Sequence, residues 1–434
     1  MRASRLHLLV SHVDMGALKR LVERILPRSL YRALLIPYHV GWSLCSAIRY
    51  GFPAKKLVVI GVTGTKGKSS VTEMLSAILE EAGYTVAVSS TIHFKTGKTT
   101  RPNKFKMTLP GRGFIQKLLA EAVRDGATHA VIELTSESAL QYRHLFLSLD
   151  ALVFTNLEKE HIESHGSMEK YFQAKFRLGT ALARSSKRPR AIIANSEGEY
   201  GRRFLKLQVE RSIAFALSDA ENLVLTDQST SFEFDNTHVS LPHPGAFSAR
   251  NALAAIKAAA FVGVPVPVSA KALGNLGRIA GRAERIERGQ DFLAVVDYAH
   301  TPDSLLALYQ AYPERRKVCV LGNTGGGRDT WKRPEMGRIA DEYCDEVILA
   351  NEDPYDEDPQ AIMDAMAAGM KRSPTIIMDR REAIHEALSR ARGGDAVLVT
   401  GKGTDPYIME ANGKKTPWSD AQVVAEELEK LLLS

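Results

Sequence analysis

Residues 57–83, LVVIGVTGTKGKSSVTEMLSAILEEAG, contain the pattern that decides the fold of this chain. The apolar run Leu57–Val62 is typical of a buried strand, and a glycine-rich turn that ends at Ser69 follows it. Apolar side chains then recur at helical spacing before Gly83, at Val71, Met74, Leu75, Ile78, Leu79 and Ala82. A strand, a glycine turn and a helix in this order predict an α/β domain with a phosphate-binding loop.

The residue types in this turn suit a bound phosphate. Backbone N–H groups at a helix N-terminus face the anion, Lys68 can reach the terminal phosphates, and Ser69 offers a hydroxyl to Mg²⁺. Val62 stands where the strict phosphate-loop pattern has its first glycine, so an ordinary strand–helix turn with chance glycines is the alternative. The Lys-Ser pair directly at the helix start favours the phosphate loop.

Composition indicates a soluble globular chain. The chain has 434 residues, of which 44% are hydrophobic and 25% charged, which suggests two or three domains. No apolar run approaches the ~20 residues of a membrane span, and no convincing signal-peptide cleavage site is present. The cysteines, Cys45, Cys319 and Cys344, predict neither a disulfide framework nor a zinc site, which fits a reducing cytoplasm.

The positive charge is concentrated at the N-terminus. Residues 1–56 hold ten lysines and arginines against two acidic residues, a net +8, so the remaining residues carry −1 of the total +7. Apolar spacing predicts one helix that ends at Pro27 and a second apolar stretch that is broken at Pro37. Two interpretations remain: a contact with a membrane surface or anionic ligand, and a helical extension packed on the next domain with a solvated basic face. A nucleic-acid-binding arm is not expected, because no such motif is present.

Alternation of strands and helices continues along the chain. Further strands are expected at 86–89, 130–134, 151–155 and 191–195, then a β-rich segment at 203–244, then a second series at 293–297, 317–321, 346–350, 375–378 and 396–400. The prediction is an α/β fold with three parts. A basic helical segment (1–55) precedes a central P-loop ATPase-like domain with a mostly parallel sheet (56–277) and a Rossmann-like doubly wound domain (278–434).

Two metal-ligating residue types fall at strand ends. Glu133 closes one expected strand, and His161 follows another. In an open α/β sheet the ligand crevice lies outside those carboxyl ends. Each residue alone is typical of a hydrogen-bonded surface position, but together with the phosphate loop they favour a Mg²⁺ site.

From about residue 56 to the C-terminus, the chain resembles the Mur ligase family of ATP-dependent amide-forming synthetases. The motifs that carry the resemblance are Gly64-Thr-Lys-Gly-Lys-Ser69, Thr108-Leu-Pro110, Glu133-Leu-Thr-Ser136, Thr155-Asn-Leu…His161 with Tyr171 and Lys175, Asn251-Ala-Leu-Ala-Ala, Gly281-Arg282, Asp297-Tyr-Ala-His-Thr-Pro302, Arg328-Asp-Thr-Trp-Lys-Arg-Pro334 and Gly401-Lys-Gly403. The motif at 297–302, with the later Glu-Asp-Pro and Gly-Lys-Gly, is similar to the MurE branch, which adds the third residue of the peptidoglycan stem peptide.

The resemblance implies a ligase of peptidoglycan biosynthesis. ATP would phosphorylate a carboxylate of a UDP-N-acetylmuramoyl-peptide-like donor to an acyl phosphate, and an amino-acid amine would attack it to give an amide, ADP and phosphate. Such chemistry needs cations on the γ-phosphate, a fixed carboxylate and a separately positioned amine. The implied cofactors are ATP, two Mg²⁺ ions and a carbamate.

The resemblance also implies roles for single residues. Lys68, Lys175, His161 and Arg282 form the catalytic set, and Ser69, Glu133, His161 and Lys175 the metal set, with Lys175 matching the family lysine that reacts with CO₂ to form the carbamate. The ATP-binding set is Gly64, Thr65, Lys66, Gly67, Lys68, Ser69, Ser70, Asn251, Arg282, Asp297 and His300. Thr108, Thr135 and Ser136 would hold the donor, and Arg328, Asp329, Lys332, Arg333, Glu352, Asp353, Tyr355, Gly401 and Asp405 the acceptor.

Three departures from the family pattern bear on the substrates. Only about 55 residues precede the phosphate loop, whereas the UDP-binding domain of the family is close to a hundred residues long. Tyr355 replaces the arginine that holds the distal carboxylate in diaminopimelate-type enzymes, which argues against diaminopimelate and leaves lysine or another acceptor open. Asp405 replaces a glutamate and can still hold an ammonium, from a shorter side chain.

Three alternatives to this ligase were weighed. A folylpolyglutamate-synthetase-like ligase shares the mechanism but fits the later motifs poorly. A zinc-bearing amidotransferase partner is disfavoured by the lack of a four-cysteine cluster. A non-catalytic, nucleotide-dependent module on a membrane surface would use the basic N-terminus but would not need the Lys68, Glu133 and Lys175 set.

Overall fold

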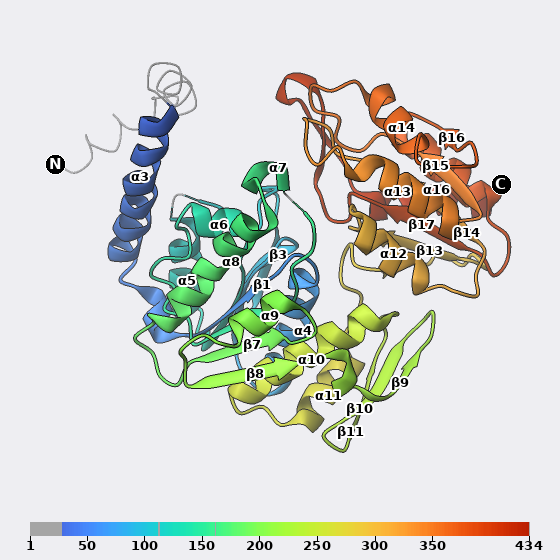
Figure 1. Cartoon of the computed structure of the whole chain (residues 1–434). Helices are drawn as coiled ribbons and strands as arrows, with labels where there is room; N and C mark the ends of the chain where they lie inside the picture. The colour runs from blue at the N-terminus through green and yellow to red at the C-terminus, as the bar shows by residue number, and fades with distance from the viewer. Residues whose placement is uncertain (1–27, 112, 161, 434) are drawn as a thin grey trace.

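The computed structural model describes residues 28–111, 113–160 and 162–433. Figure 1 shows a helix at the N-terminal side, a central lobe and a C-terminal lobe. The helix is α3 (Arg28–Arg49), and the short helix η1 (Pro53–Lys56) leads from it into the central lobe. The predicted α/β class, with a helical segment ahead of two sheets, is confirmed. The domain boundaries themselves stay a prediction.

The central lobe contains an eight-stranded sheet in the order β4-β3-β2-β5-β1-β6-β7-β8. Its strands are β1 (Val58–Thr63), β2 (Val86–Ser89), β3 (His93–Thr96), β4 (Thr99–Pro102), β5 (His129–Glu133), β6 (Ala151–Phe154), β7 (Ala191–Asn195) and β8 (Arg211–Phe215). Only the β2–β3 and β3–β4 pairs are antiparallel. Because β1 lies between β5 and β6, the loop after β1 emerges in the middle of the sheet.

Helices cover both faces of this sheet, since successive side chains of each strand point to opposite faces. Ile60 and Val62 pack with α4 (Lys68–Glu81), α10 (Ala246–Phe261) and α11 (Val266–Gly274). Val59 belongs to the core on the other face, which includes residues of α5 (Phe114–Arg124), α6 (Ser136–Leu140), α8 (Met168–Ala183) and α9 (Glu199–Phe204). The small helix α7 (Ile162–His165) precedes α8, and an antiparallel sheet of β9 (Glu221–Leu225), β10 (Thr230–Phe234) and β11 (Thr237–Leu241) adjoins α10 and α11.

The C-terminal lobe is a doubly wound sheet in the order β12-β13-β17-β14-β15-β16. Its strands are β12 (Glu284–Arg285), β13 (Leu293–Asp297), β14 (Lys317–Leu321), β15 (Glu346–Leu349), β16 (Thr375–Ile376) and β17 (Ala396–Thr400). One face packs on α12 (Pro302–Gln310), α13 (Lys332–Tyr343) and α14 (Pro359–Ala367), and the other on α15 (Arg380–Arg390) and α16 (Asp420–Leu433). A hairpin of β18 (Tyr407–Met409) and β19 (Lys415–Pro417) extends from it.

Two expectations from the sequence are wrong. Cys319 and Cys344 form a disulfide, because β14 and β15 are adjacent parallel strands and the crossover through α13 returns the chain beside its start. Helix α3 continues through Pro37, where a break was expected; the loss of one backbone hydrogen bond does not end it. Cys45 is free and exposed.

Candidate active site

The phosphate loop is fixed by two glycines that no other residue could replace without displacing a neighbour. Gly64 has φ +148°, and a Cβ there would lie 1.9 Å from Thr155 Oγ1. Gly67 has φ +79°, and its Cβ would lie 2.3 Å from the Asn251 side-chain oxygen. The loop therefore packs closely against the segment after β6 and against α10.

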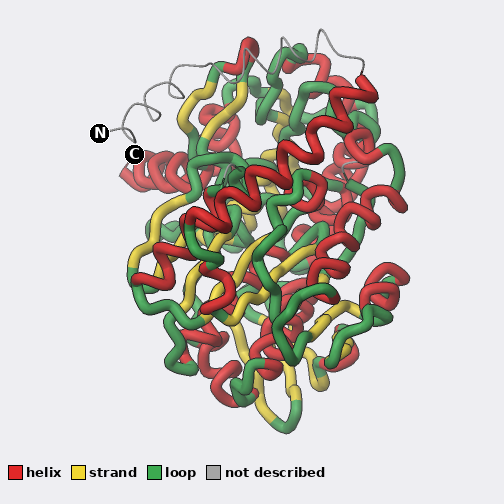
Figure 2. Tube along the Cα trace, turned by 90° about the vertical axis from the view of Figure 1, so that its left-hand side faces the viewer, coloured by secondary structure: helices red, strands yellow, loops and turns green. Residues whose placement is uncertain are grey.

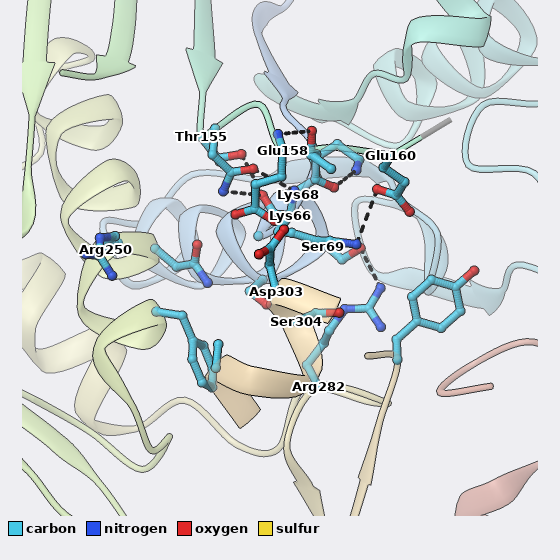
Figure 3. A pocket seen from close by; sticks show the side chains of 18 of the residues that line it. Lys66, Lys68, Ser69, Thr155, Glu158, Glu160, Arg250, Arg282, Asp303 and Ser304 are labelled. Carbon is cyan, nitrogen blue, oxygen red and sulfur yellow. Dashed lines mark hydrogen bonds and ion pairs between the residues drawn. The ribbon is translucent and has the colours of Figure 1, made fainter. Parts of the chain in front are cut away.

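A cavity of about 660 Å³ opens beside this loop, within the size range of small-molecule sites. Both lobes line it, and Figure 3 shows Arg282 of the C-terminal lobe reaching toward Ser69. The predicted site residues that line the cavity are Thr65, Lys66, Gly67, Lys68, Ser69, Ser70, Thr108, Glu133, Thr135, Ser136, Lys175, Asn251, Arg282, Asp297 and His300. The structure thus brings the described members of the predicted nucleotide, metal and donor sets to one place, except Gly64, which does not line the cavity.

Oxygen ligands suited to Mg²⁺ lie side by side on the cavity wall. Ser69 Oγ donates to Glu133 Oε2 over 3.1 Å, and the backbone N–H of Thr91 donates to the same carboxylate oxygen over 2.9 Å. His161, predicted for the second ion, lies outside the described residues. Among the residues that are described, no three His, Cys, Asp or Glu side chains form a metal-binding group. A Mg²⁺ ion at Ser69 and Glu133 would complete its shell with water and phosphate oxygens, which Mg²⁺ prefers.

Two buried lysines flank the loop. Lys68 Nζ donates to the Thr65 carbonyl over 2.8 Å, and Lys175 Nζ donates to the Gly64 carbonyl over 2.7 Å. Burial lowers the pKa of Lys68, although nearby carboxylates oppose the shift. Burial, and then the charge of Lys68, lower the pKa of Lys175 well below its usual value. Lys175 therefore favours its neutral amine form.

The two lobes meet through hydrogen bonds across the cavity. Arg282 Nη2 donates to Ser69 Oγ over 3.1 Å. Glu160 accepts from Lys66 Nζ over 3.2 Å and lies 2.8 Å from His300 Nε2. The sequence motifs assign no role to Glu160, although Glu160 directly precedes the predicted metal ligand His161 in the sequence. Its position between the two lobes required the folded structure.

A second carboxylate was also missed. Glu158 lines the cavity, and its Oε2 is buried with no hydrogen-bond partner among the described residues. Burial raises the pKa of Glu158 to about 7. A carboxyl group with this pKa beside a phosphate loop can be protonated when a strongly negative ligand is bound there, and can ionise when no such ligand is bound.

We expect the Glu158→Gln variant to differ from the parent protein in its pH-stability profile. Between about pH 4.5 and pH 7 Glu158 holds a proton in the folded protein but not in the unfolded chain. Folding stability therefore falls as pH rises through this range and Glu158 ionises. Glutamine cannot ionise, so the melting temperature of the variant should rise relative to that of the parent between about pH 4.5 and pH 7. The exposed Glu221→Gln change is the matched control and should show no such trend. A difference in melting temperature between variant and parent that stays constant with pH would contradict the raised pKa of Glu158.

The predicted acceptor residues form a separate cluster outside the cavity. Asp353 Oδ1 accepts from Lys402 Nζ over 2.8 Å, and Asp353 Oδ2 accepts from Lys106 Nζ over 2.5 Å. Lys106 also lies 3.3 Å from Asp405 Oδ2. Lys106 belongs to the loop of the central lobe that carries Thr108, so this contact joins the expected donor and acceptor regions.

Other members of the acceptor set are engaged elsewhere. Arg333 makes two hydrogen bonds to Glu357, of 2.6 and 2.9 Å, and Lys332 Nζ donates to the His300 carbonyl over 3.0 Å. The backbone N–H of Asp329 donates to Glu163, and Glu352 accepts from Thr324 over 2.9 Å. The Arg328 guanidinium lies 5.1 Å from the ring centre of Tyr355, and a Cβ at Gly401 would meet Glu352 Oε2 at 2.3 Å.

Family models match two long segments of the sequence. Residues 62–259 match the Mur ligase middle domain, and residues 281–403 match the Mur ligase, glutamate ligase domain. The chain belongs to the Mur ligase family. This Mur ligase is therefore an ATP-dependent, amide-bond-forming enzyme that uses Mg²⁺, as the sequence predicted.

Relatives cover most of this Mur ligase. A UDP-N-acetylmuramoyl-L-alanyl-D-glutamate–2,6-diaminopimelate ligase of Caldanaerobacter subterraneus subsp. tengcongensis is 34% identical over 394 residues, 87% of this chain and 80% of the relative. A solved structure of an enzyme with the same name has a TM-score of 0.59 at 27% identity, covering 87% and 79% of the two chains. Folylpolyglutamate synthase of Mycobacterium tuberculosis, solved with ADP and AMPPCP, shares the fold at 15% identity, with a TM-score of 0.68 over 84% of this chain and 93% of that one.

Proposed function

We propose that this Mur ligase joins an amino acid to a carboxylate of a UDP-N-acetylmuramoyl-peptide donor through an acyl phosphate, and releases ADP and phosphate. The observation that carries the proposal is the cavity in which Lys68, Ser69 and Glu133 of one lobe meet Arg282 and His300 of the other. The names of the relatives support the donor class. ATP and a UDP-linked donor point to a reaction in the cytoplasm.

The cavity residues would share the work of the first step. Lys68 would contact the β- and γ-phosphates, Arg282 the γ-phosphate, and Asn251 the adenine side. Mg²⁺ held by Ser69 and Glu133 would neutralise phosphate charge. Thr108, Thr135 and Ser136 line the same cavity and would fix the donor carboxylate, because the reaction needs it in line with the γ-phosphate.

Lys175 would carry the carbamate. Its neutral amine would attack the carbon of CO₂, so that a nitrogen–carbon bond forms and the electron pair of one C=O π bond moves onto oxygen. The nitrogen would lose one proton to water, which leaves an anionic carbamate oxygen as a metal ligand at the end of the side chain. The buried position, the lowered pKa and the place of Lys175 on the cavity wall support this role. A second Mg²⁺ would then bind the carbamate, with His161, outside the described residues, as its other ligand.

The acceptor would be an amino acid with a side-chain ammonium. Asp353 and Asp405 already hold two ammonium groups between them, those of Lys106 and the buried Lys402, so this site fits an acceptor amine that takes the place of Lys106. Diaminopimelate is the further candidate. Its distal carboxylate could meet Arg328 and Lys106, whose cationic groups lie 5.1 and 5.9 Å from the ring centre of Tyr355.

The three segments predicted from the sequence would then divide the reaction. Residues 56–277 would bind ATP and hold the activated carboxylate, and residues 278–434 would present the acceptor amine. The described part of the N-terminal segment, residues 34–55, lines no part of the cavity.

An acceptor screen tests the proposal. With ATP, Mg²⁺ and UDP-N-acetylmuramoyl-dipeptide, we expect phosphate release with lysine, ornithine or diaminopimelate and none with amino acids that lack a side-chain amine, with products identified by mass.

The Asp405→Asn variant should raise the acceptor KM by about 10- to 100-fold, because it loses a charge-assisted contact, and should leave the donor KM unchanged. Asp235→Asn, on an exposed turn of the small sheet, is the matched control.

Other outcomes would contradict the proposal. Turnover with a folate-type donor and glutamate, but not with the UDP-linked donor, would favour the folylpolyglutamate-synthetase alternative. Binding of ATP without turnover in any combination would favour the nucleotide-dependent binding module.

A further inference from the structure

Helix α3 presents an apolar surface to solvent. Its inner side is fixed to the central lobe, where Ser43 Oγ donates to the Tyr142 carbonyl over 3.0 Å and Ser46 and Ala47 are buried. The exposed large apolar side chains of α3, here called the α3 surface, are Leu34, Ile36, Tyr38, Trp42, Leu44 and Ile48, each between 39% and 60% exposed. Figure 2, in which this side of the molecule faces the viewer, shows α3 crossing in front of the rest of the chain.

The charge pattern of this segment is the reverse of that of an ordinary surface helix, which has charged residues on its outer face. Residues 33–48 contain no Asp, Glu, Lys or Arg. Basic residues instead stand on both sides of the stretch: Arg28 and Arg32 precede it, and the exposed Arg49, Lys55 and Lys56 follow it. Residues 34–48 therefore have no solvated basic face, because the charges lie at the ends of the apolar stretch.

We propose that the α3 surface docks on an anionic lipid bilayer. Apolar side chains with Trp and Tyr among them fit the boundary between headgroups and acyl chains, and flanking cations fit anionic headgroups. None of the helices in the described ranges is long and apolar enough to cross a membrane, so α3 would lie in the plane of the interface. This inference does not depend on the proposed acceptor or donor.

The positive charge of the N-terminal segment favours an anionic bilayer, rather than a second copy of the chain, as the partner of the α3 surface. Residues 1–56 carry +8, so an interface between two α3 surfaces would bring two strongly positive segments together. An anionic bilayer would instead attract these cations, and each Lys or Arg near the membrane surface would raise the affinity for the bilayer about fivefold.

The position of α3 leaves the reaction free to proceed on the membrane. In Figure 1, α3 lies on one side of the central lobe and the C-terminal lobe on the other. No residue of α3 lines the 660 Å³ cavity. Docking through α3 would therefore cover neither the cavity nor the contacts between the lobes.

Vesicle sedimentation with the full chain tests the inference. We expect binding to vesicles of phosphatidylglycerol and phosphatidylcholine, weakened by high salt, and little binding to phosphatidylcholine alone. Trp42→Ser combined with Ile48→Ser should weaken binding at least tenfold without changing ATP turnover. Val224→Ser combined with Leu225→Ser is the matched control, because these β9 residues are as exposed and as apolar but lie on another part of the molecule.

A charge variant completes the experiment. Lys55→Gln combined with Lys56→Gln should weaken binding to the anionic vesicles by about 25-fold. Equal binding to both kinds of vesicle, or unchanged binding of the Trp42 and Ile48 variant, would overturn the inference. A concentration-dependent dimer that this variant abolishes would also overturn it, by assigning the α3 surface to a contact between copies of the chain.

Discussion

Replacing Lys68 with alanine is expected to reduce ATP turnover by about a hundredfold to a thousandfold. The Lys68 ammonium is buried beside Ser69 and Glu133 at the start of α4, where the terminal phosphates would lie. A cation fixed in a site that excludes water stabilises developing phosphate charge far more than one in solvent, and loss of one such group typically costs two to three orders of magnitude. The measurement is steady-state phosphate release with donor and acceptor present.

The control for Lys68 must separate catalysis from folding. Among the described residues Lys68 donates only to the Thr65 carbonyl, and its burial disfavours the charged form. Its removal should therefore leave the melting temperature within a few degrees of the parent value. Lys271→Ala removes an exposed lysine of α11 that pairs with Glu81 and should keep full activity. Near-normal turnover of the folded Lys68→Ala protein would remove the phosphate-loop assignment.

The phosphate loop could be predicted because its signals are local. The apolar strand, the glycines and the Lys-Ser pair stand next to one another, and the structure places β1, the loop and α4 accordingly. The glycines also show why the strict motif is unnecessary here. Gly64 and Gly67 are the positions at which a Cβ would collide with neighbours, whereas Val62 lies inside β1, where a side chain packs into the core.

The contacts between the lobes could not be predicted, because they join residues that are far apart in sequence. Glu160 and His300 are separated by 140 residues, and Lys106 and Asp353 by 247. No periodicity or motif encodes how two separately folded sheets face each other. For the same reason the family pattern could not reveal that Glu357 pairs with Arg333, which had been expected to hold the acceptor.

The N-terminal segment shows a different limit of sequence reasoning. Counting charges identified the excess of +8 but not its position on the folded surface. One side of α3 packs on the central lobe through Ser43, Ser46 and Ala47, and the other exposes large apolar side chains to solvent. Charge and apolar spacing alone do not reveal which side faces the lobe, and the folded structure does.

Lys175→Ala is expected to lower turnover by at least a hundredfold and to regain part of it with formate, acetate or propionate. A carbamate supplies an anionic oxygen at the end of the lysine chain, and a small carboxylic acid can place a similar oxygen in the space that alanine leaves. The Lys175 amine is suited to carbamate formation because it is 2% exposed and its pKa is lowered well below the usual value, so the nucleophilic neutral form is favoured.

Two controls make the rescue specific to Lys175. The Lys68→Ala variant should not respond to the acids, because its missing group is a cation. Lys170→Ala, on the exposed side of the same helix, should be active without them. Labelled bicarbonate gives an independent readout, since the parent protein should retain the label at one lysine and the Lys175→Ala protein should not. Absence of both rescue and label would show that Lys175 acts as an amine. Its 2.7 Å hydrogen bond to the Gly64 carbonyl would then be its role, which is to hold the phosphate loop in shape.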